Sequence, residues 1–340
     1  MKCVAMAVVD SDALYCKRLS EYIRSHLKLS FEIESFTDAQ KFNEFLDEKE
    51  ISLLVISESL ALRLEKENLG RNCKNIMILD EEGKDMTLED ISEIRVCHVS
   101  KYLPASEIVD RILGLCISGA EDFSGLSYAV GDNTCRILGF YTPISRCGQT
   151  SFAIKMGEAL SKKARTLFIS FESFSALTSL FEQEAEEDIT DLLYFADCER
   201  DKFCLYLEKI KRTRNGLDYI APAKSAMQIK EISYEKIREL TELLAVEAGY
   251  EYIIFDMKEY PDGFFEILDM CDVIYTVIRN NSADHYRLGR YTKALGENGY
   301  ERVITKTMKC MLPDGRDITS YNRYIEDIII RSREVSGVGA

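Results

Sequence analysis

The sequence predicts an α/β protein built from two doubly wound, parallel-sheet domains. Short apolar runs alternate with longer amphipathic stretches along most of the 340 residues, a pattern typical of parallel sheets covered by helices on both faces. The alternation is interrupted once, at residues 117–133, which are rich in Gly, Ser and Asp. We therefore expect a first domain at residues 1–116, a linker at 117–133 and a second domain at 134–335.

The first block contains five short apolar runs that we expect to be strands: Cys3–Val9, Phe31–Ser35, Leu53–Ser57, Asn75–Leu79 and Arg95–Val99. Apolar residues at helical spacing fill the gaps, most clearly at Ala13–Leu27 and Ser106–Leu115. Five strands in such an alternation favour a flavodoxin-like sheet.

The second block repeats the pattern. Its expected strands are Arg136–Tyr141, Thr166–Phe171, Asp218–Ile220, Tyr252–Asp256, Asp272–Ile278 and Arg302–Lys306. Its expected helices are Thr150–Lys162, Tyr234–Ala248, Ala283–Leu295 and Ser320–Arg331. The last of these has an apolar stripe but mixed charges on its other face, so we expect it to pack on its own domain and not on a membrane.

Composition limits the function. The net charge of -15 argues against nucleic acid as a partner, since nucleic-acid-binding surfaces are basic. The 11 cysteines have no CxxC spacing and only three histidines accompany them, which argues against a zinc site and favours free thiols in a reducing cytoplasm. No apolar run is long enough for a transmembrane segment.

The first block has the layout of a phosphoreceiver domain without its phosphoacceptor. Asp10 and Asp12 follow the first expected strand, where receivers hold Mg²⁺, and Lys101 follows the fifth. The third strand, however, ends at Ser57 where an acceptor Asp is needed. Asp12 has a second interpretation as the N-cap of the following helix. We therefore interpret the block as an interaction module.

A damaged phosphate-binding loop opens the second block. The segment YTPISRCGQTSF (Tyr141–Phe152) joins an expected strand to an expected helix, the context of the P-loop GxxxxGK[ST]. Gly148 and Thr150 fit that template, whereas Pro143 replaces its first glycine and Gln149 its lysine. We expect the nucleotide phosphates to bind to Ser145, Arg146, Cys147, Gly148, Gln149, Thr150 and Ser151.

Two acidic residues end neighbouring strands. Asp256 ends the strand EYIIFD, the place of the acidic residue that supports Mg²⁺ in P-loop proteins, and Glu172 ends TLFISF. Ligands of open α/β sheets bind beyond the carboxyl ends of the strands. We therefore expect Thr150 and Asp256 to hold Mg²⁺, and Glu172 and Asp256 to be the catalytic candidates.

This layout resembles the MinD/ParA family of deviant Walker-A ATPases, whose loop reads KGGxGK[ST]. Aligned on Gly148 and Thr150, Ile144 takes the place of the signature lysine that reaches across the family's sandwich dimer. Glu172 matches the family's switch I aspartate and Asp256 its switch II aspartate. The resemblance implies ATP and Mg²⁺ as cofactors and a homodimer through the second domain.

An atypical receiver joined to a MinD/ParA-like domain resembles the TadZ/CpaE family of tight-adherence (type IV) pilus proteins. The resemblance implies a cytoplasmic localisation or scaffold protein that binds pilus or secretion machinery through its receiver-like domain. It also implies recruitment to the cell pole or to the inner membrane face by those partners.

The loss of both loop lysines predicts weak or no hydrolysis, because charge that develops in the transition state is left uncompensated. Binding depends more on backbone amides and is expected to survive. Three alternatives stay open: a slow ATPase positioning switch in which Arg146 replaces a lysine, a phosphorelay response-regulator-like protein, and a DNA-partition ATPase, which the acidic charge disfavours.

Overall fold

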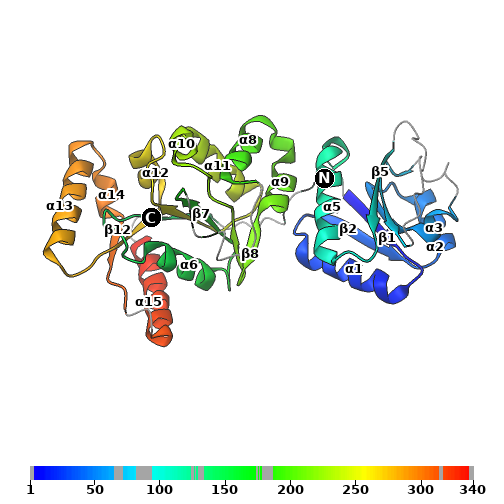
Figure 1. Ribbon diagram of the computed structural model, residues 1–340, viewed down its shortest axis with the longest axis horizontal. Coiled ribbons are helices and arrows are strands. Elements are labelled where there is room, and N and C mark those ends of the chain that lie inside the picture. Colours follow the sequence, from blue (N-terminus) through cyan, green and yellow to red (C-terminus); the bar gives the residue numbers. More distant parts are fainter. Residues whose placement is uncertain are drawn as a thin grey trace. The chain divides into compact units, whose positions relative to one another are not determined.

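We describe a computed structural model of the chain, which covers residues 4–64, 72–81, 94–123, 126, 128, 134–173, 175, 177, 187–313 and 317–336. Contacts divide the chain into two compact units (Figure 1). The first unit comprises Met1–Ala129 together with Glu199–Lys209, and the second comprises Val130–Cys198 with Ile210–Ala340. In the described part of the chain, no helix is long and apolar enough to cross a membrane.

The first unit is a five-stranded parallel sheet in the order β2-β1-β3-β4-β5, which confirms the flavodoxin-like prediction. The strands are β1 (Val4–Val9), β2 (Phe31–Phe36), β3 (Leu53–Ser57), β4 (Asn75–Asp80) and β5 (Arg95–Ser100). The connecting helices are α1 (Ala13–His26), α2 (Ala39–Glu48), α3 (Glu58–Ala61) and α5 (Ala105–Ser118), followed by the 3-10 turn η1 (Ala120–Phe123). The Asp12 carboxylate accepts from the amides of Leu14 and Tyr15 and so caps α1.

A segment distant in sequence completes the first unit. It consists of the turn η2 (Arg200–Lys202) and most of helix α9 (Phe203–Ile210). The buried Glu208 carboxylate of α9 accepts a 2.6 Å hydrogen bond from the Tyr128 hydroxyl. Tyr128, within the expected linker, also pairs with Leu29 by an isolated β-bridge.

The second unit is a seven-stranded sheet in the order β12-β11-β6-β10-β7-β9-β8, parallel except for the β8–β9 edge hairpin. Its strands are β6 (Arg136–Phe140), β7 (Thr166–Phe171), β8 (Arg212–Arg214), β9 (Leu217–Tyr219), β10 (Tyr252–Met257), β11 (Val273–Val277) and β12 (Thr307–Cys310). The strand that leads into the loop, β6, lies between β10 and β11. The predicted doubly wound α/β class is thus confirmed for both units.

Helices cover both faces of this sheet. Figure 1 shows α6 (Gln149–Leu160) and α15 (Ile318–Ser336) on one face, and α8 (Ile189–Cys198), α10 (Ala226–Glu231), α11 (Tyr234–Val246) and α12 (Phe264–Met270) on the other. Helices α13 (Ser282–Glu297) and α14 (Glu301–Thr305) connect β11 to β12.

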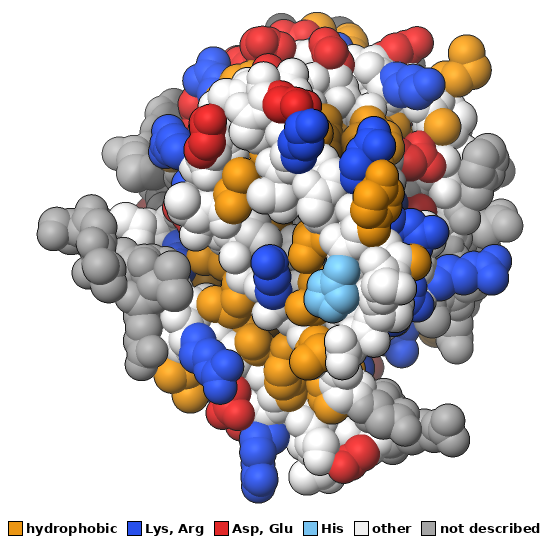
Figure 2. All heavy atoms as spheres, turned by 90° about the vertical axis from the view of Figure 1, so that its left-hand side faces the viewer, with side chains coloured by type: hydrophobic (Ala, Val, Ile, Leu, Met, Phe, Trp, Pro, Cys, Tyr) orange, Lys and Arg blue, Asp and Glu red, His pale blue; other side chains and the backbone are white. Residues whose placement is uncertain are grey.

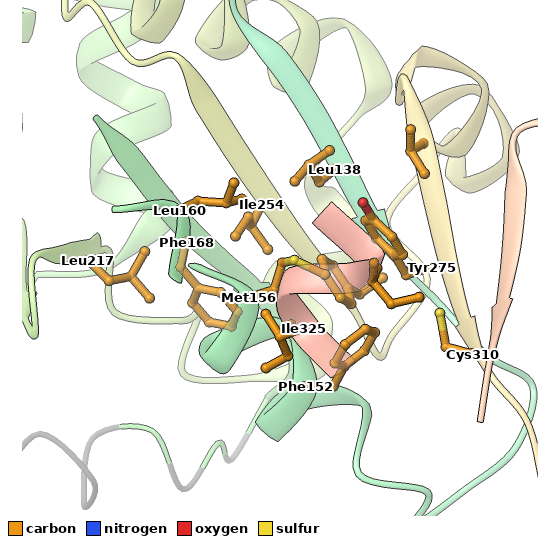
Figure 3. Packing of buried hydrophobic residues seen from close by; sticks show 14 of the residues in the cluster. Leu138, Phe152, Met156, Leu160, Phe168, Leu217, Ile254, Tyr275, Cys310 and Ile325 are labelled. Carbon is orange, nitrogen blue, oxygen red and sulfur yellow. The ribbon is translucent and has the colours of Figure 1, made fainter. Parts of the chain in front are cut away.

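The C-terminal helix packs on its own unit, as the sequence predicted. Ile325 and Ile328 of α15 are buried in the same cluster as Phe152 and Met156 of α6, and Figure 3 shows Ile325 beside these side chains. The rings of Phe152 and Tyr324 lie 6.3 Å apart. This contact holds α15 against α6, the helix that follows the loop after β6.

One predicted strand is wrong. Residues Arg302–Lys306 were expected to be a strand, but helix α14 occupies Glu301–Thr305 and the strand β12 begins only at Thr307. Short apolar runs fit either state, and here the helix buries Val303 completely while the Thr307 hydroxyl bonds back to the Val303 carbonyl.

Candidate functional site

The loop between β6 and α6 is compact and ends at a glycine. Gly148 is the N-cap of α6, with φ of 86°, a left-handed conformation that glycine adopts without steric cost. Arg146 also has a positive φ, 53°. Ile144 is turned inward, with 3% of its surface exposed, and the Cys147 thiol lies 3.3 Å from the Ile144 carbonyl oxygen. The loop therefore presents backbone at a helix N-terminus, as anion binding requires.

The Gln149 side chain points into the sheet. Its amide nitrogen lies 3.0 Å from the Phe140 carbonyl oxygen, 2.7 Å from Asp256 Oδ1 and 3.2 Å from the Met257 carbonyl oxygen, and the residue is 3% exposed. These contacts join the start of α6 to the ends of β6 and β10. In this arrangement the Gln149 backbone, and not its side chain, is left for a phosphate.

Thr150 and Asp256 meet at the same point. The Thr150 hydroxyl donates a 2.7 Å hydrogen bond to Asp256 Oδ2, so both oxygens of this fully buried carboxylate are hydrogen-bonded. Burial raises the pKa of Asp256 to about 6, despite the opposing effects of the hydrogen bonds from Gln149 and Thr150 and of the Lys258 charge. The carboxyl therefore titrates near neutral pH.

Two cations that the sequence analysis missed lie near the loop. Lys258 follows β10 and forms a 3.7 Å ion pair with Glu172, which also places Glu172 close to Asp256. Arg279 follows β11, and its guanidinium approaches the Ser145 carbonyl oxygen at 3.5 Å. Burial raises the pKa of the Cys147 thiol, while both cations act to lower it. Lys258 lies only two residues beyond Asp256, a spacing that could have singled it out.

The remaining predicted residues lie on the outer side of the loop. Ser145, Arg146 and Ser151 are exposed, and Cys147 is half-buried. Arg146, the residue expected to replace a lysine, thus has its side chain at the surface of the loop. All seven predicted loop residues belong to one continuous turn and helix start, with Asp256 and Glu172 at the neighbouring strand ends.

A pocket of about 510 Å³ opens beside this loop. Cys147, Gly148 and Ser151 form one side, and Leu312 and Tyr321 are among the residues opposite. Arg279 also lines it. The pocket is large enough for a drug-sized ligand and combines an apolar wall with exposed loop backbone.

These residues fit a nucleotide with Mg²⁺, with one exception. The Thr150 hydroxyl and the Asp256 carboxylate are the donors that Mg²⁺ prefers, and Gly148 leaves the backbone approachable. Within the described residues there is no cluster of three or more His, Cys, Asp or Glu side chains, so Mg²⁺ would also need phosphate oxygens and water. The exception is Gln149, which supplies no positive charge.

The first unit carries a second polar cluster at the carboxyl ends of its strands. Lys101 forms ion pairs with Asp10 at 2.7 Å and with Glu81 at 3.0 Å. Burial lowers the pKa of Lys101, but its hydrogen bonds with the two carboxylates outweigh this and raise it overall. Ser57 is fully buried at the end of β3, and the Glu58 carboxylate accepts from the Glu81 amide. Lys101 is thus shared by two carboxylates of this cluster.

Comparison with known proteins finds one family model and several solved structures that are similar to parts of the chain. Residues 1–115 match the family model described as TadZ-like, receiver domain. Solved structures similar to the chain include a ParA family ATPase from Chlorobium tepidum, 21% identical over 58% of this chain and 81% of that one, with a TM-score of 0.45. A cobyrinic acid a,c-diamide synthase from Mycobacterium smegmatis with bound ATP analogue and magnesium is 15% identical over 58% and 82% of the two chains (TM-score 0.41).

A putative plasmid partition protein from Borrelia burgdorferi bound to AMPPNP is 15% identical over 58% of this chain and 99% of that one, with a TM-score of 0.40. No curated protein matches the chain in sequence.

Proposed function

We propose that the chain is a TadZ/CpaE-type protein that binds ATP and serves as a localisation or scaffold protein. The match of residues 1–115 to the TadZ-like receiver model and the seven-stranded α/β sheet of the second unit support this proposal. The protein acts in a tight-adherence pilus or secretion assembly. It binds ATP with Mg²⁺ and hydrolyses it weakly or not at all.

The Gln149 contacts carry this proposal. Gln149 stands where the P-loop template has lysine. Its side-chain amide donates hydrogen bonds to Phe140, Asp256 and Met257 inside the sheet. The pair that suits Mg²⁺, Thr150 and Asp256, is intact beside it. A site of this kind can hold a nucleotide by backbone amides and metal, but it lacks the cation that would stabilise transition-state charge.

The remaining parts of the proposal follow from the family type. The second domain, residues 134–335, forms a homodimer, and the receiver-like domain, residues 1–116, binds pilus or secretion proteins. Such partners would recruit the protein to the cell pole or the inner membrane face. In the receiver-like domain, the ion pairs of Lys101 with Asp10 and Glu81 support a docking role over a phosphorelay role.

Calorimetric titration of the full-length protein with ATP, with and without Mg²⁺, tests the binding. We expect saturable binding that Mg²⁺ strengthens, and phosphate release at the background rate. Thr150→Val should weaken Mg²⁺-dependent binding by about ten-fold, the effect of about 1.4 kcal/mol. Thr37→Val, at an exposed position in the first unit, is the matched control and should change nothing. Absence of binding at millimolar nucleotide would contradict the proposal.

A slow ATPase is the second candidate, and the positions of Lys258 and Arg279 favour it. Lys258 lies two residues beyond Asp256, and Arg279 approaches the Ser145 carbonyl oxygen at 3.5 Å. Either cation could supply positive charge to the loop by exchanging its ion pair, with Glu172 for Lys258 and with Asp284 for Arg279. In that case phosphate release would exceed background in the wild type and fall on Lys258→Met or Arg279→Met. Release that is absent in all three proteins supports the scaffold instead.

A further inference from the structure

An open groove of about 440 Å³ lies on the second unit and is lined largely by aromatic rings. We call it the aromatic groove; its rings are Tyr141, Tyr260, Phe264, Phe265, Tyr286 and Tyr291. Tyr260 and Tyr286 are 59% and 68% exposed, so the groove presents aromatic surface to solvent.

Five of the six rings form a connected cluster. The Tyr141 ring lies 4.9 Å from that of Phe264 and 5.0 Å from that of Tyr291, and Phe264 lies 4.8 Å from Tyr260 and 5.6 Å from Phe265. The exposed Tyr260 ring is thus held by its neighbours, and the exposed Tyr286 lines the same groove. Ordered, partly exposed tyrosines of this kind are typical of protein-binding hot spots, because little conformational entropy is lost when they are covered.

Positive charge accompanies the rings. Arg287 and Arg290, one helical turn apart on α13, line the same groove, whose described lining residues include no carboxylate. Arg287 is partly neutralised by a 3.1 Å ion pair with the buried Asp284. Figure 2 shows hydrophobic side chains beside Lys and Arg side chains on the face where α13 lies, with Asp and Glu side chains toward its edges. The groove itself is thus lined by two arginines on a chain of net charge -15.

The charge of Arg287 and Arg290 favours an acidic partner segment over a second copy of the chain as the occupant of the groove. In a two-fold dimer through this groove, the same patch would face itself and bring like charges together. An acidic segment of another protein meets complementary charge instead. Its apolar side chain covers the exposed rings, and its carboxylates reach Arg287 and Arg290, for which Arg–carboxylate geometry is favourable.

We propose that the aromatic groove binds an acidic peptide segment of a partner protein, which inserts one large apolar side chain among the rings. The groove adjoins the nucleotide loop, since Tyr141 begins that loop and Tyr260 follows Lys258 by two residues. The proposal does not depend on nucleotide binding and can be tested without nucleotide.

Fluorescence anisotropy of the full-length protein tests it with a labelled probe, acetyl-Glu-Asp-Phe-Leu-Glu-Asp-Glu-amide. We expect saturable binding that weakens as salt increases. Tyr286→Ala and Arg290→Glu should each weaken binding by at least about ten-fold. Their matched controls, Tyr194→Ala and Arg323→Glu, change exposed residues on other helices and should leave binding unchanged. Tyr286→Phe keeps the ring and should retain binding, which separates contact from folding.

Three results would overturn the proposal. The first is no saturable binding at about millimolar protein, and the second is equal binding of a probe with Lys in place of every acidic residue. The third is self-association of the protein, detected by light scattering. In this case Tyr286→Ala would abolish the self-association, and the acidic probe would not compete with it. That result would make the groove an interface between two copies of the chain.

Discussion

The two units carry polar clusters at the carboxyl ends of their strands, and the two clusters partner a buried carboxylate differently. In the first unit Ser57 ends the strand at which a receiver would need an acceptor aspartate, and Lys101 pairs with Asp10 and Glu81. In the second unit Gln149 stands at the position that the P-loop template gives to lysine, and Asp256 is held by neutral donors.

The difference teaches how a buried carboxylate is accommodated. Asp10 is fully buried but has an ammonium 2.7 Å away. Asp256 is equally buried, yet its nearest partners are an amide and a hydroxyl, and burial raises its pKa to about 6. Asp10 thus has a charged partner in direct contact, whereas Asp256 has only neutral donors in direct contact. The metal–nucleotide complex that we propose would bring positive charge next to Asp256.

The largest expected effect is a loss of stability when the ion pairs of Lys101 in the first unit are removed. Lys101→Met leaves Asp10 buried without its cation, and loss of one partner of a buried pair costs about 3–5 kcal/mol. Hydrogen exchange of peptides from the first unit should show this loss. Adding Asp10→Asn to the variant should recover part of it, because no buried charge then remains unpaired. Lys17→Met, at an exposed pair with Glu21, is the control and should cost little.

The next largest effect is the pH dependence of stability that the buried Asp256 carboxyl causes in the second unit. A carboxyl whose pKa is higher in the folded than in the unfolded chain adds stability below pH about 4, and this stability is lost as the pH rises through about 6. Asp256→Asn removes the titration, so at pH 8 the variant should be more stable than the wild type, by about 3 kcal/mol for a shift of about two pKa units.

The measurement is the difference in unfolding free energy between wild type and variant from pH 4 to pH 8. The difference should be small at pH 4 and grow toward pH 7. Asp197→Asn, at an exposed position of α8, should show no such trend. In the same Asp256→Asn variant, Mg²⁺ should no longer strengthen ATP binding. The substitution would then increase stability and reduce function. A pH-independent difference would contradict the raised pKa.

Much of this comparison was predictable from local sequence. Most strands followed from apolar runs such as Leu53–Ser57 and Thr166–Phe171, which match the observed bounds, and so did the flavodoxin-like order of the first sheet. The cap at Asp12 and the loop glycine at Gly148 depend on backbone chemistry within a few residues, and both lie where the pattern placed them.

The missed features have other causes. The inward direction of Gln149 depends on Asp256 and Met257, which come near only when β6 and β10 pair. The approach of Arg279 to Ser145 is likewise a tertiary contact. The edge strand β8 has no apolar run, although the Asn215–Gly216 turn, with φ of 51° and 83°, is a local hairpin signal that was overlooked.

A third prediction makes the second cluster resemble the first. In Gln149→Lys, the ammonium can donate to the three acceptors that the amide now approaches and can pair with Asp256. The pKa of Asp256 should fall, and ATP should bind about ten-fold more tightly, since a charge-assisted contact exceeds a neutral one by about 1.4 kcal/mol. Titration calorimetry measures this, with Gln40→Lys as the charge-matched control. Unchanged affinity would mean that the lysine stays locked on Asp256.

The smallest expected effect concerns the proposed homodimer. In the family that the second unit resembles, a lysine reaches across the dimer toward the nucleotide; here Ile144 takes its place and is 3% exposed within its own loop. Nucleotide should therefore change the dimerisation constant of the wild type by less than about ten-fold, under 1.4 kcal/mol. Light scattering of the full-length chain with and without ATP and Mg²⁺ measures this. Ile144→Lys should introduce a nucleotide dependence, whereas Ile318→Lys, at an exposed position of α15, should not. A wild-type dimer that dissociates when nucleotide is removed would show that other residues perform the lysine's role, and the scaffold proposal would give way to a nucleotide switch.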